Sequence, residues 1–229
     1  MKPISILFED DFFLAVDKPS GVLSIPPRAG QEEDIFSFFK AKYEDLRLVH
    51  RIDKETSGVL IFAKGEEAQR SLSLLFEHHT IFKEYKAILS AIPKEDEGTI
   101  ENYLDEHPNV KGTYRVAYQG KGKLAISHYQ IVEKYKRNSL VAFQIETGRT
   151  HQIRVHAQFL GCPLAYDPVY NPQNGIFLSR FIKNYKGKED ERSIIQRLSL
   201  HAQTMRFYHP FTEEVIDIQS PYPKDFQKA

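Results

Sequence analysis

The chain of 229 residues contains a single cysteine, Cys162. An intrachain disulfide is therefore impossible, and zinc sites built from several cysteines are excluded. A reducing, cytoplasmic setting is the compartment that this composition favours. No apolar run approaches the roughly 20 residues needed to cross a bilayer, and the first residues lack the apolar core of a signal peptide. We therefore expect no membrane partner.

Net charge is also absent, because 31 Lys and Arg residues balance 31 Asp and Glu residues. This balance argues against binding nucleic acid by bulk charge, although a neutral protein can still carry a local basic cleft. The sequence has no H-E-x-x-H, no nucleotide-cradling glycine loop and no G-x-S-x-G elbow. The adjacent pair His78–His79 points in different directions on a helix, and His151 and His156 are about 140° apart by helical spacing. We expect no metal and no cofactor.

Apolar residues make up 41% of the chain, with 16 phenylalanines and 12 tyrosines. That is enough for a core of one large domain or of two small lobes sharing one core. Alternating apolar residues and turn signals predict a hairpin over 4–16, a strand over 58–63, strands at 82–92, 99–104, 113–118, 125–134 and 140–146, and a final strand pair at 198–208 and 215–218. Five strands in close succession favour an antiparallel or mixed sheet over a doubly wound parallel one.

Helical spacing of apolar residues predicts helices over 34–43, 66–79 and 151–160. Thr150 is a good N-cap for the last helix, and Gly161 is suited to end it. Residues 165–192 lack periodicity and predict a long surface loop with one short helix; the tail after Pro221 predicts a short terminal helix or disorder. We expect a single α+β domain over 1–229.

The stretch His50–Gly58 combines charged residues with the turn formers Thr56, Ser57 and Gly58, directly before an apolar strand. Asp53 there is either a turn residue that accepts hydrogen bonds or a working carboxylate on a loop fixed by a rigid strand. Gly58 tolerates the backbone angles that such a turn needs. A carboxylate nucleophile must be ionised, and a nearby guanidinium keeps it so.

The candidate partners for Asp53 are Arg51, Arg149 and Arg154.

Tyr85 shares a strand face with Lys83. A tyrosine beside a basic residue on one strand face can stack on a nucleobase while the basic residue contacts its phosphate, or it is an ordinary half-buried strand tyrosine. Glu55 and Asp53 can also be read as a pair of glycosidase carboxylates.

Several blocks together resemble the RluA family of RNA pseudouridine synthases. His50–Gly58 is similar to the family's H-R-L-D-x-x-T-S-G, with Ile52 in place of Leu. Glu146–His156 resembles a second long block closely. Shorter matches are Asp17–Gly21, Lys83–Ala87, Ala125–Tyr129, Leu198–Ala202 and His209–Pro210. The resemblance runs almost from end to end of the chain.

The resemblance implies the pseudouridine synthase fold: a long mixed, mainly antiparallel sheet bent around a central cleft, with flanking helices and two lobes sharing one sheet. It implies that Asp53 is the catalytic carboxylate, that Tyr85 stacks on the flipped uracil, and that Arg154 pairs with Asp53. Arg51 would fill the gap left by the flipped nucleotide. The expected substrate-binding residues are Arg51, His50, Arg149, His151 and Lys54. The expected partner is ribosomal or transfer RNA, bound by a monomer.

The chain departs from the family pattern at Tyr166 and Asn171, where the family usually has glycine, and we expect no S4 RNA-binding domain of the kind that many members carry. The competing readings are an RNA-binding or chaperone-like domain without activity on the same scaffold, and the glycosidase that uses Asp53 and Glu55. The sequence leaves open whether Asp53 attacks C1′, attacks C6 or acts at the 2′ position.

Overall fold

The protein was analysed as a computed structural model that describes residues 4–27, 32–118, 121–172, 175–177, 179, 185 and 191–228. The chain divides into two compact units. The first contains Met1–Glu84 and His201–Pro221, and the second contains Tyr85–Leu200 and Tyr222–Ala229. The boundaries fall inside two strands, β5 (Phe82–Leu89) and β10 (Leu200–Tyr208).

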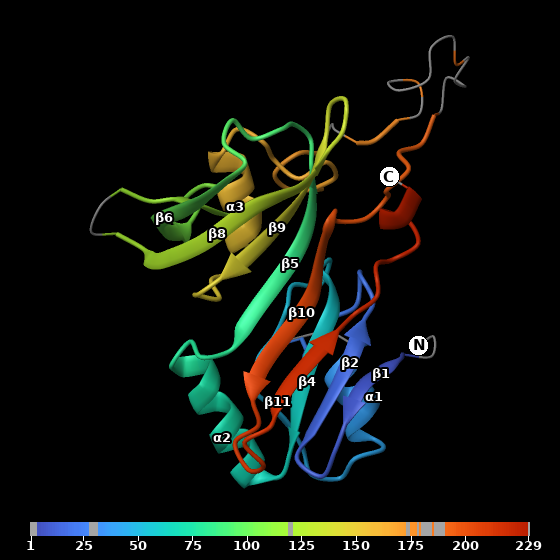
Figure 1. The fold of residues 1–229 in the computed structure, drawn as a ribbon, viewed down its shortest axis with the longest axis vertical. Helices are drawn as coiled ribbons and strands as arrows, with labels where there is room; N and C mark the ends of the chain where they lie inside the picture. The colour runs from blue at the N-terminus through green and yellow to red at the C-terminus, as the bar shows by residue number, and fades with distance from the viewer. Residues whose placement is uncertain are drawn as a thin grey trace. The chain divides into compact units, whose positions relative to one another are not determined.

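The first unit is built on a mixed sheet (Figure 1). Its strands, besides β10, are β1 (Ile6–Glu9), β2 (Phe13–Lys18), β3 (Leu46–Leu48), β4 (Ser57–Lys64) and β11 (Val215–Gln219). The strands β1, β2, β4 and β10 follow one another in that order, with β11 on β10 and β3 on β4. Every pair is antiparallel except β4 with β10, which is parallel. The predicted hairpin at the start and strand pair at the end are confirmed.

Two helices cover opposite faces of this sheet. Successive residues of β2 and β4 are buried on alternate faces, so each face needs a helix to cover it. Helix α2 (Glu66–Glu77) buries Leu72 in a cluster with the odd-numbered Phe13 and Ile61. Helix α1 (Ile35–Lys40) buries Phe39 with residues of the other face, including Leu60. Strand β4 therefore has both faces buried, which accounts for its continuous apolar run. Both helices were predicted, α1 with a longer extent.

Gly58 lies inside β4, in agreement with the strand predicted over 58–63, and not in the preceding turn that we also expected it to supply. Its backbone has φ +113°, and it pairs with Ala202 of β10 in the parallel ladder. A Cβ at Gly58 would lie 2.0 Å from the Ala202 carbonyl oxygen. Close approach of two backbones, together with the left-handed φ, is what requires glycine here.

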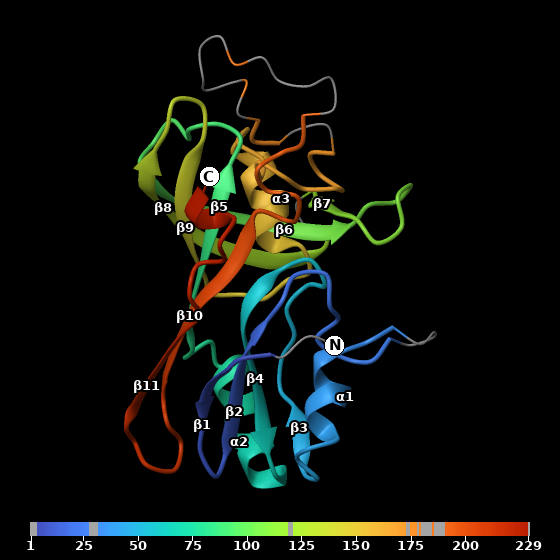
Figure 2. The same ribbon diagram turned by 90° about the vertical axis from the view of Figure 1, so that its right-hand side faces the viewer.

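The second unit carries a mainly antiparallel set of strands with one helix (Figure 2). Beyond β5 it contains β6 (Glu97–Glu106), β7 (Tyr114–Val116), β8 (Lys123–Lys134), β9 (Ser139–Ile145) and helix α3 (Gln152–Phe159). The order is β5, β9, β8, β6, β7. All five strands predicted between residues 82 and 146 are confirmed, and they are antiparallel where they pair.

Helix α3 packs through Ile153 and Ala157 on a core that includes Phe143 of β9. The prediction of Thr150 as its N-cap was wrong: His151 holds that position, with left-handed backbone angles (φ 58°, ψ 19°) and no side-chain capping bond. The helix ends as expected at Gly161, whose φ is +72°. Helices and strands thus combine in a mixed, mainly antiparallel α+β fold, as predicted.

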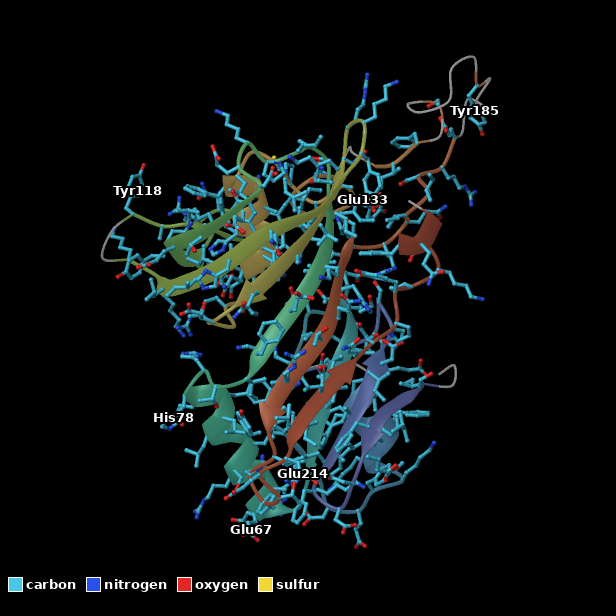
Figure 3. All side chains as sticks on the ribbon, viewed as in Figure 1. Glu67, His78, Tyr118, Glu133, Tyr185 and Glu214 are labelled. Atoms are coloured by element: carbon cyan, nitrogen blue, oxygen red, sulfur yellow. The ribbon has the colours of Figure 1, made fainter. Side chains whose placement is uncertain are left out.

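The predicted loop over 165–192 and the C-terminal tail lie outside these elements. The described parts of 165–192 are irregular, with a bridge between Asp167 and Asn171, while most of 180–190 lies outside the described residues. The tail forms a short 3-10 helix at Phe226–Lys228. Figure 3 shows the side chain of Tyr118 projecting away from the strands of the second unit, where it is 83% exposed. Within the described ranges, no helix is long and apolar enough to cross a membrane.

Candidate active site

The loop that carries Asp53 enters β4 through a turn. The Thr56 amide donates to the Asp53 carbonyl at 3.1 Å, which closes the turn predicted from the sequence. Thr56 and Ser57 are buried, while Asp53 is half-buried. The carboxylate therefore sits at the last turn before a rigid, fully buried strand.

A buried lysine fixes the backbone of this loop. The Nζ atom of Lys18 donates to the carbonyl oxygens of Pro19 (2.9 Å), Val22 (2.7 Å) and Lys54 (2.8 Å). Its side chain is fully buried. Burial lowers the pKa of Lys18 from 10.5 to about 7, and the nearby carboxylates of Glu55 and Asp53 oppose that shift. Three carbonyl acceptors suit an ammonium group, which has three N–H donors.

The segment that follows Lys18 holds three neighbouring carbonyls of the same loop. Ser24 Oγ donates to the Ile52 carbonyl at 2.7 Å and accepts the Ile52 amide at 3.2 Å. The Gly21 amide donates to Lys54 at 2.9 Å, and Ser20 Oγ donates to the Glu55 carbonyl at 2.5 Å. The backbone on both sides of Asp53 is therefore bonded to residues 18–24. These bonds preorganise the candidate catalytic loop.

The other predicted residues of the first unit have different surroundings. His50 Nε2 accepts the Ile61 amide at 3.0 Å, and its ring stacks on Phe76 with centroids 4.6 Å apart. Burial lowers the pKa of His50 to about 3, so the ring stays neutral and can accept this bond. Arg51 is exposed, and Lys54 forms an exposed ion pair with Glu32 at 2.5 Å.

Tyr85 is the first residue of the second unit and lies in β5. Its ring is half-buried against the main core cluster of that unit, which includes Ala87 and Leu89. Alternation along the strand predicts that Tyr85 and Ala87 share a face, and both belong to this cluster or pack against it. Lys83 is buried, and desolvation lowers its pKa.

The turn before α3 is organised by Gln152. Its Oε1 accepts the Thr147 hydroxyl at 2.8 Å and the Arg149 amide at 3.0 Å, and its Nε2 donates to the Ile126 carbonyl and to Ser127 Oγ, each at 2.9 Å. All four hydrogen-bonding positions of the amide are thus used. The network fixes the backbone from which the Arg149 side chain extends.

The Arg149 side chain borders an open cavity of about 320 Å³ in the second unit. Its Nε donates to the Leu124 carbonyl at 2.8 Å. The lining combines Tyr114, Lys123 and Thr150 with the carboxylates of Asp105 and Glu106. Planar and polar groups around such a cavity suit a polar, planar ligand.

Arg154 is buried in α3 and forms a bidentate ion pair with Asp167. The Nε–Oδ2 distance is 2.8 Å and the Nη2–Oδ1 distance is 2.7 Å. Burial pushes the pKa of the Asp167 carboxyl upward, but hydrogen bonds and charge from Arg154 and amides of Tyr170 and Val169 bring it below its ordinary value. Asp167 is thus an ionised partner that holds one edge of the guanidinium.

Two residues of this site were not singled out from the sequence. Lys18 reads as part of a short block, and only its position between an apolar strand and a Pro-Ser-Gly turn hints that it is buried. Asp167 lies in a segment without periodicity, so its pairing with Arg154 needs tertiary contacts. Among the described residues, no group of three or more His, Cys, Asp and Glu side chains is arranged to hold a metal.

Comparison with known proteins gives one consistent family. A family model described as RNA pseudouridylate synthase matches residues 12–159. An RNA pseudouridine synthase of Bacillus subtilis, named YlyB and described as uncharacterized, is 32% identical over 97% of this chain and 70% of its own length. The ribosomal large subunit pseudouridine synthase D of Xanthomonas campestris is 31% identical, covering 99% and 68%. The protein of the same name from Neisseria meningitidis serogroup B is 34% identical, and this chain spans 59% of it.

Solved structures show the same likeness. Human RNA Pseudouridylate Synthase Domain Containing 4 aligns with a TM-score of 0.75 at 26% identity, covering 97% of this chain and 90% of that one. Human RNA Pseudouridylate Synthase Domain Containing 1 aligns with a TM-score of 0.74 at 25% identity, covering 97% and 87%.

Proposed function

Because this chain belongs to the RNA pseudouridylate synthase family, we propose that it isomerises specific uridines of RNA to pseudouridine, with Asp53 as the catalytic carboxylate. The observation that carries the proposal is that hydrogen bonds fix the backbone of the loop around Asp53. Backbone carbonyls of Ile52, Lys54 and Glu55 are each bonded by a group from residues 18–24. A side chain on so firmly held a loop is suited to act on one defined atom.

The reaction fits the residue types available. The N1–C1′ bond of uridine breaks, the uracil turns, a C5–C1′ bond forms, and C5 loses a proton while N1 gains one. Bonds broken and formed balance without a redox step, so the reaction itself calls for no electron carrier. The uracil must first leave its stack to reach a carboxylate. Asp53 acts as nucleophile at C1′ or C6, or at the 2′ position.

We assign the other roles by the family resemblance. Tyr85 stacks on the uracil and serves as its base. Arg154 pairs with Asp53 and keeps it ionised. The half-buried ring of Tyr85 and the bidentate fixing of Arg154 by Asp167 support these assignments, because both side chains are held in place.

RNA binding is assigned to exposed and half-buried polar residues of both units. Arg51 fills the gap left by the flipped nucleotide, and Lys54 contacts phosphate. Arg149 and His151 bind RNA beside the 320 Å³ cavity, which is large enough for a nucleobase. His50 contributes by holding β4, since its Nε2 accepts the Ile61 amide. The two units together form one catalytic domain.

The substrate we propose first is large-subunit ribosomal RNA, because the relatives of X. campestris and N. meningitidis carry that substrate in their names. Transfer RNA is the second candidate. Either substrate places the enzyme in the cytoplasm.

The test is tritium release from RNA transcripts labelled at uridine C5, with large-subunit rRNA and tRNA in separate reactions. Release without a free sugar product supports pseudouridine formation. An RNA-binding domain without activity binds the transcripts and releases no tritium. A glycosidase that uses Asp53 and Glu55 releases a sugar from a substrate that is not RNA. Mapping pseudouridines in a deletion strain then identifies the position.

A further inference from the structure

Asp167 and Tyr170 contact Arg154 of α3, and Tyr170 also contacts its N-cap residue His151, all within the second unit. Asp167 is 1% exposed and Arg154 is 3% exposed. The two side chains join through two parallel hydrogen bonds of 2.8 and 2.7 Å. A bidentate fork sets the plane of a guanidinium, because both donors on that edge must stay in the plane of the carboxylate.

Tyr170 restrains the same guanidinium from its face. The ring centroid of Tyr170 lies 4.9 Å from Arg154 Cζ. The Tyr170 amide donates to Asp167 Oδ1 at 3.0 Å, and the Val169 amide donates to the same oxygen at 2.8 Å. Asp167 and Tyr170 are therefore tied to each other as well as to Arg154. The edge contact and the face contact together remove rotation of the guanidinium group.

The hydroxyl of Tyr170 makes a second connection. It accepts the Tyr114 amide at 2.7 Å, and it lies 2.9 Å from His151 Nδ1. The Tyr114 amide can only donate, so it leaves the hydroxyl able to donate its own proton to the imidazole. In that arrangement His151 Nδ1 is the acceptor, and a neutral ring carries its proton on Nε2. The rings of His151 and Tyr170 meet edge to face, with centroids 5.6 Å apart.

We propose that Asp167 and Tyr170 are positioning residues: they set the direction of the Arg154 guanidinium and the tautomer of His151. The catalytic consequence rests on the proposed function, in which Arg154 keeps Asp53 ionised. The assignment of the His151 tautomer does not depend on the proposed function. A purely structural role, in which the pair only anchors the loop to α3, predicts lower stability without a change in the chemical step.

The experiment compares three variants of the full chain. Tyr170→Phe keeps the ring over Arg154 and removes the hydroxyl, while Tyr170→Leu removes both. Tyr166→Phe is the matched control, because it deletes a tyrosine hydroxyl from the same segment but packs in a different cluster. Thermal unfolding checks that each variant is folded at the assay temperature.

The first measurement is the ¹⁵N NMR signature of the His151 ring nitrogens in the free protein. We expect wild type and Tyr166→Phe to carry the proton on Nε2, and Tyr170→Phe to show a population protonated at Nδ1. A wild-type ring protonated at Nδ1, or a Tyr170→Phe ring unchanged from wild type, overturns the tautomer assignment.

The second measurement is the single-turnover rate at saturating RNA, together with RNA affinity. We expect Tyr170→Leu to lose about 10- to 100-fold in rate, the size of effect that a misplaced catalytic group produces, with affinity nearly unchanged. Tyr170→Phe should lose less, because the stacked ring remains. A Tyr170→Leu rate equal to that of wild type overturns the positioning of Arg154. If wild type releases no tritium from any RNA, the proposed function fails instead, and the His151 nitrogens decide the inference alone.

Discussion

Lys18 donates from its buried ammonium to the carbonyl oxygen of Lys54, 2.8 Å away and one residue beyond Asp53. The two lysines come from blocks that are 36 residues apart in the sequence. The bond joins the end of β2 to the loop that enters β4, so the candidate carboxylate is positioned by the sheet itself. The predictions below start from this relationship.

Replacing Lys18 with methionine should destabilise the fold. The carbonyls of Pro19 and Val22 lose this donor, while that of Lys54 keeps the Gly21 amide; a buried group left unpaired costs roughly 1–3 kcal/mol. We expect a loss of about 3 kcal/mol in the free energy of unfolding at pH 7, measured by urea unfolding. Exposed Lys94→Met is the control and should change stability little.

The same variant gives a pH test. Because the folded pKa of Lys18 is about 7 and its ordinary value is 10.5, the unfolded chain holds more protons at this residue between those values. Stability therefore rises with pH in this window, by at most about 1.4 kcal/mol per pH unit from this group. The stability difference between wild type and Lys18→Met should grow from pH 7 to pH 9. A constant difference would show that Lys18 is fully charged throughout.

At acid pH, two histidines should destabilise the fold. Burial lowers the pKa of His50 to about 3 and that of His156 to about 4. The unfolded chain therefore binds more protons below its ordinary value of 6.5, so stability falls as pH drops from 6.5 towards 4. His50→Gln and His156→Gln should each flatten this fall, by at most about 1.4 kcal/mol per pH unit. The exposed His78→Gln serves as the control; an equal slope in all three variants would contradict the assignment.

Substitutions of Arg154 and Arg149 should affect different steps, namely the chemical step and RNA binding. Arg154→Ala should abolish turnover, and because it also strands the buried Asp167 carboxylate, Arg154→Lys is the more informative variant. Lysine supplies a point charge without the fork, so some activity should remain. Arg149→Ala should mainly weaken RNA binding or order in its turn.

The measurement is single-turnover rate against pH for these three variants, with circular dichroism to check folding. If Arg149→Ala removes the chemical step while Arg154→Lys behaves as wild type, the two roles are assigned the wrong way round.

RNA affinity should fall steeply with salt although the net charge of the chain is zero. Phosphate contacts release counterions, and each contact contributes close to one unit to the slope of log affinity against log salt. Exposed Arg51 and Lys54 are the expected contributors, so alanine at either should lower the slope by about one. Arg154 is buried, and it should not contribute. A flat response between roughly 50 and 200 mM salt is the outcome that rejects phosphate contacts.

Much of the fold follows from local patterns in the sequence. Short apolar runs predict β2 and β4, alternation predicts β5, and helical spacing predicts α2. What periodicity cannot reach is contact between distant segments. The parallel pairing of Gly58 with Ala202 spans most of the chain, and only the resulting absence of space for a Cβ explains that glycine.

The candidate site shows the same division. Asp53 and Arg154 stand out because they belong to the two long blocks that resemble the family's. Lys18 and Asp167 act through hydrogen bonds to backbone groups or to one side chain, and such contacts leave no period in the sequence. The N-cap of α3 was missed for a local reason: Gln152 bonds the turn before the helix, so His151 adopts left-handed angles and Thr150 is not needed as a cap.

The most direct test of the account is the single-turnover tritium release of Asp53→Asn on C5-labelled RNA. Asparagine keeps the volume and removes the charge and the nucleophile. We predict no detectable turnover, with RNA affinity retained within about threefold, since phosphate contacts carry most of the binding. Glu55→Gln is the matched control: it removes a carboxylate two residues away and should keep turnover. Appreciable tritium release by Asp53→Asn would contradict the assignment of Asp53 as the catalytic carboxylate.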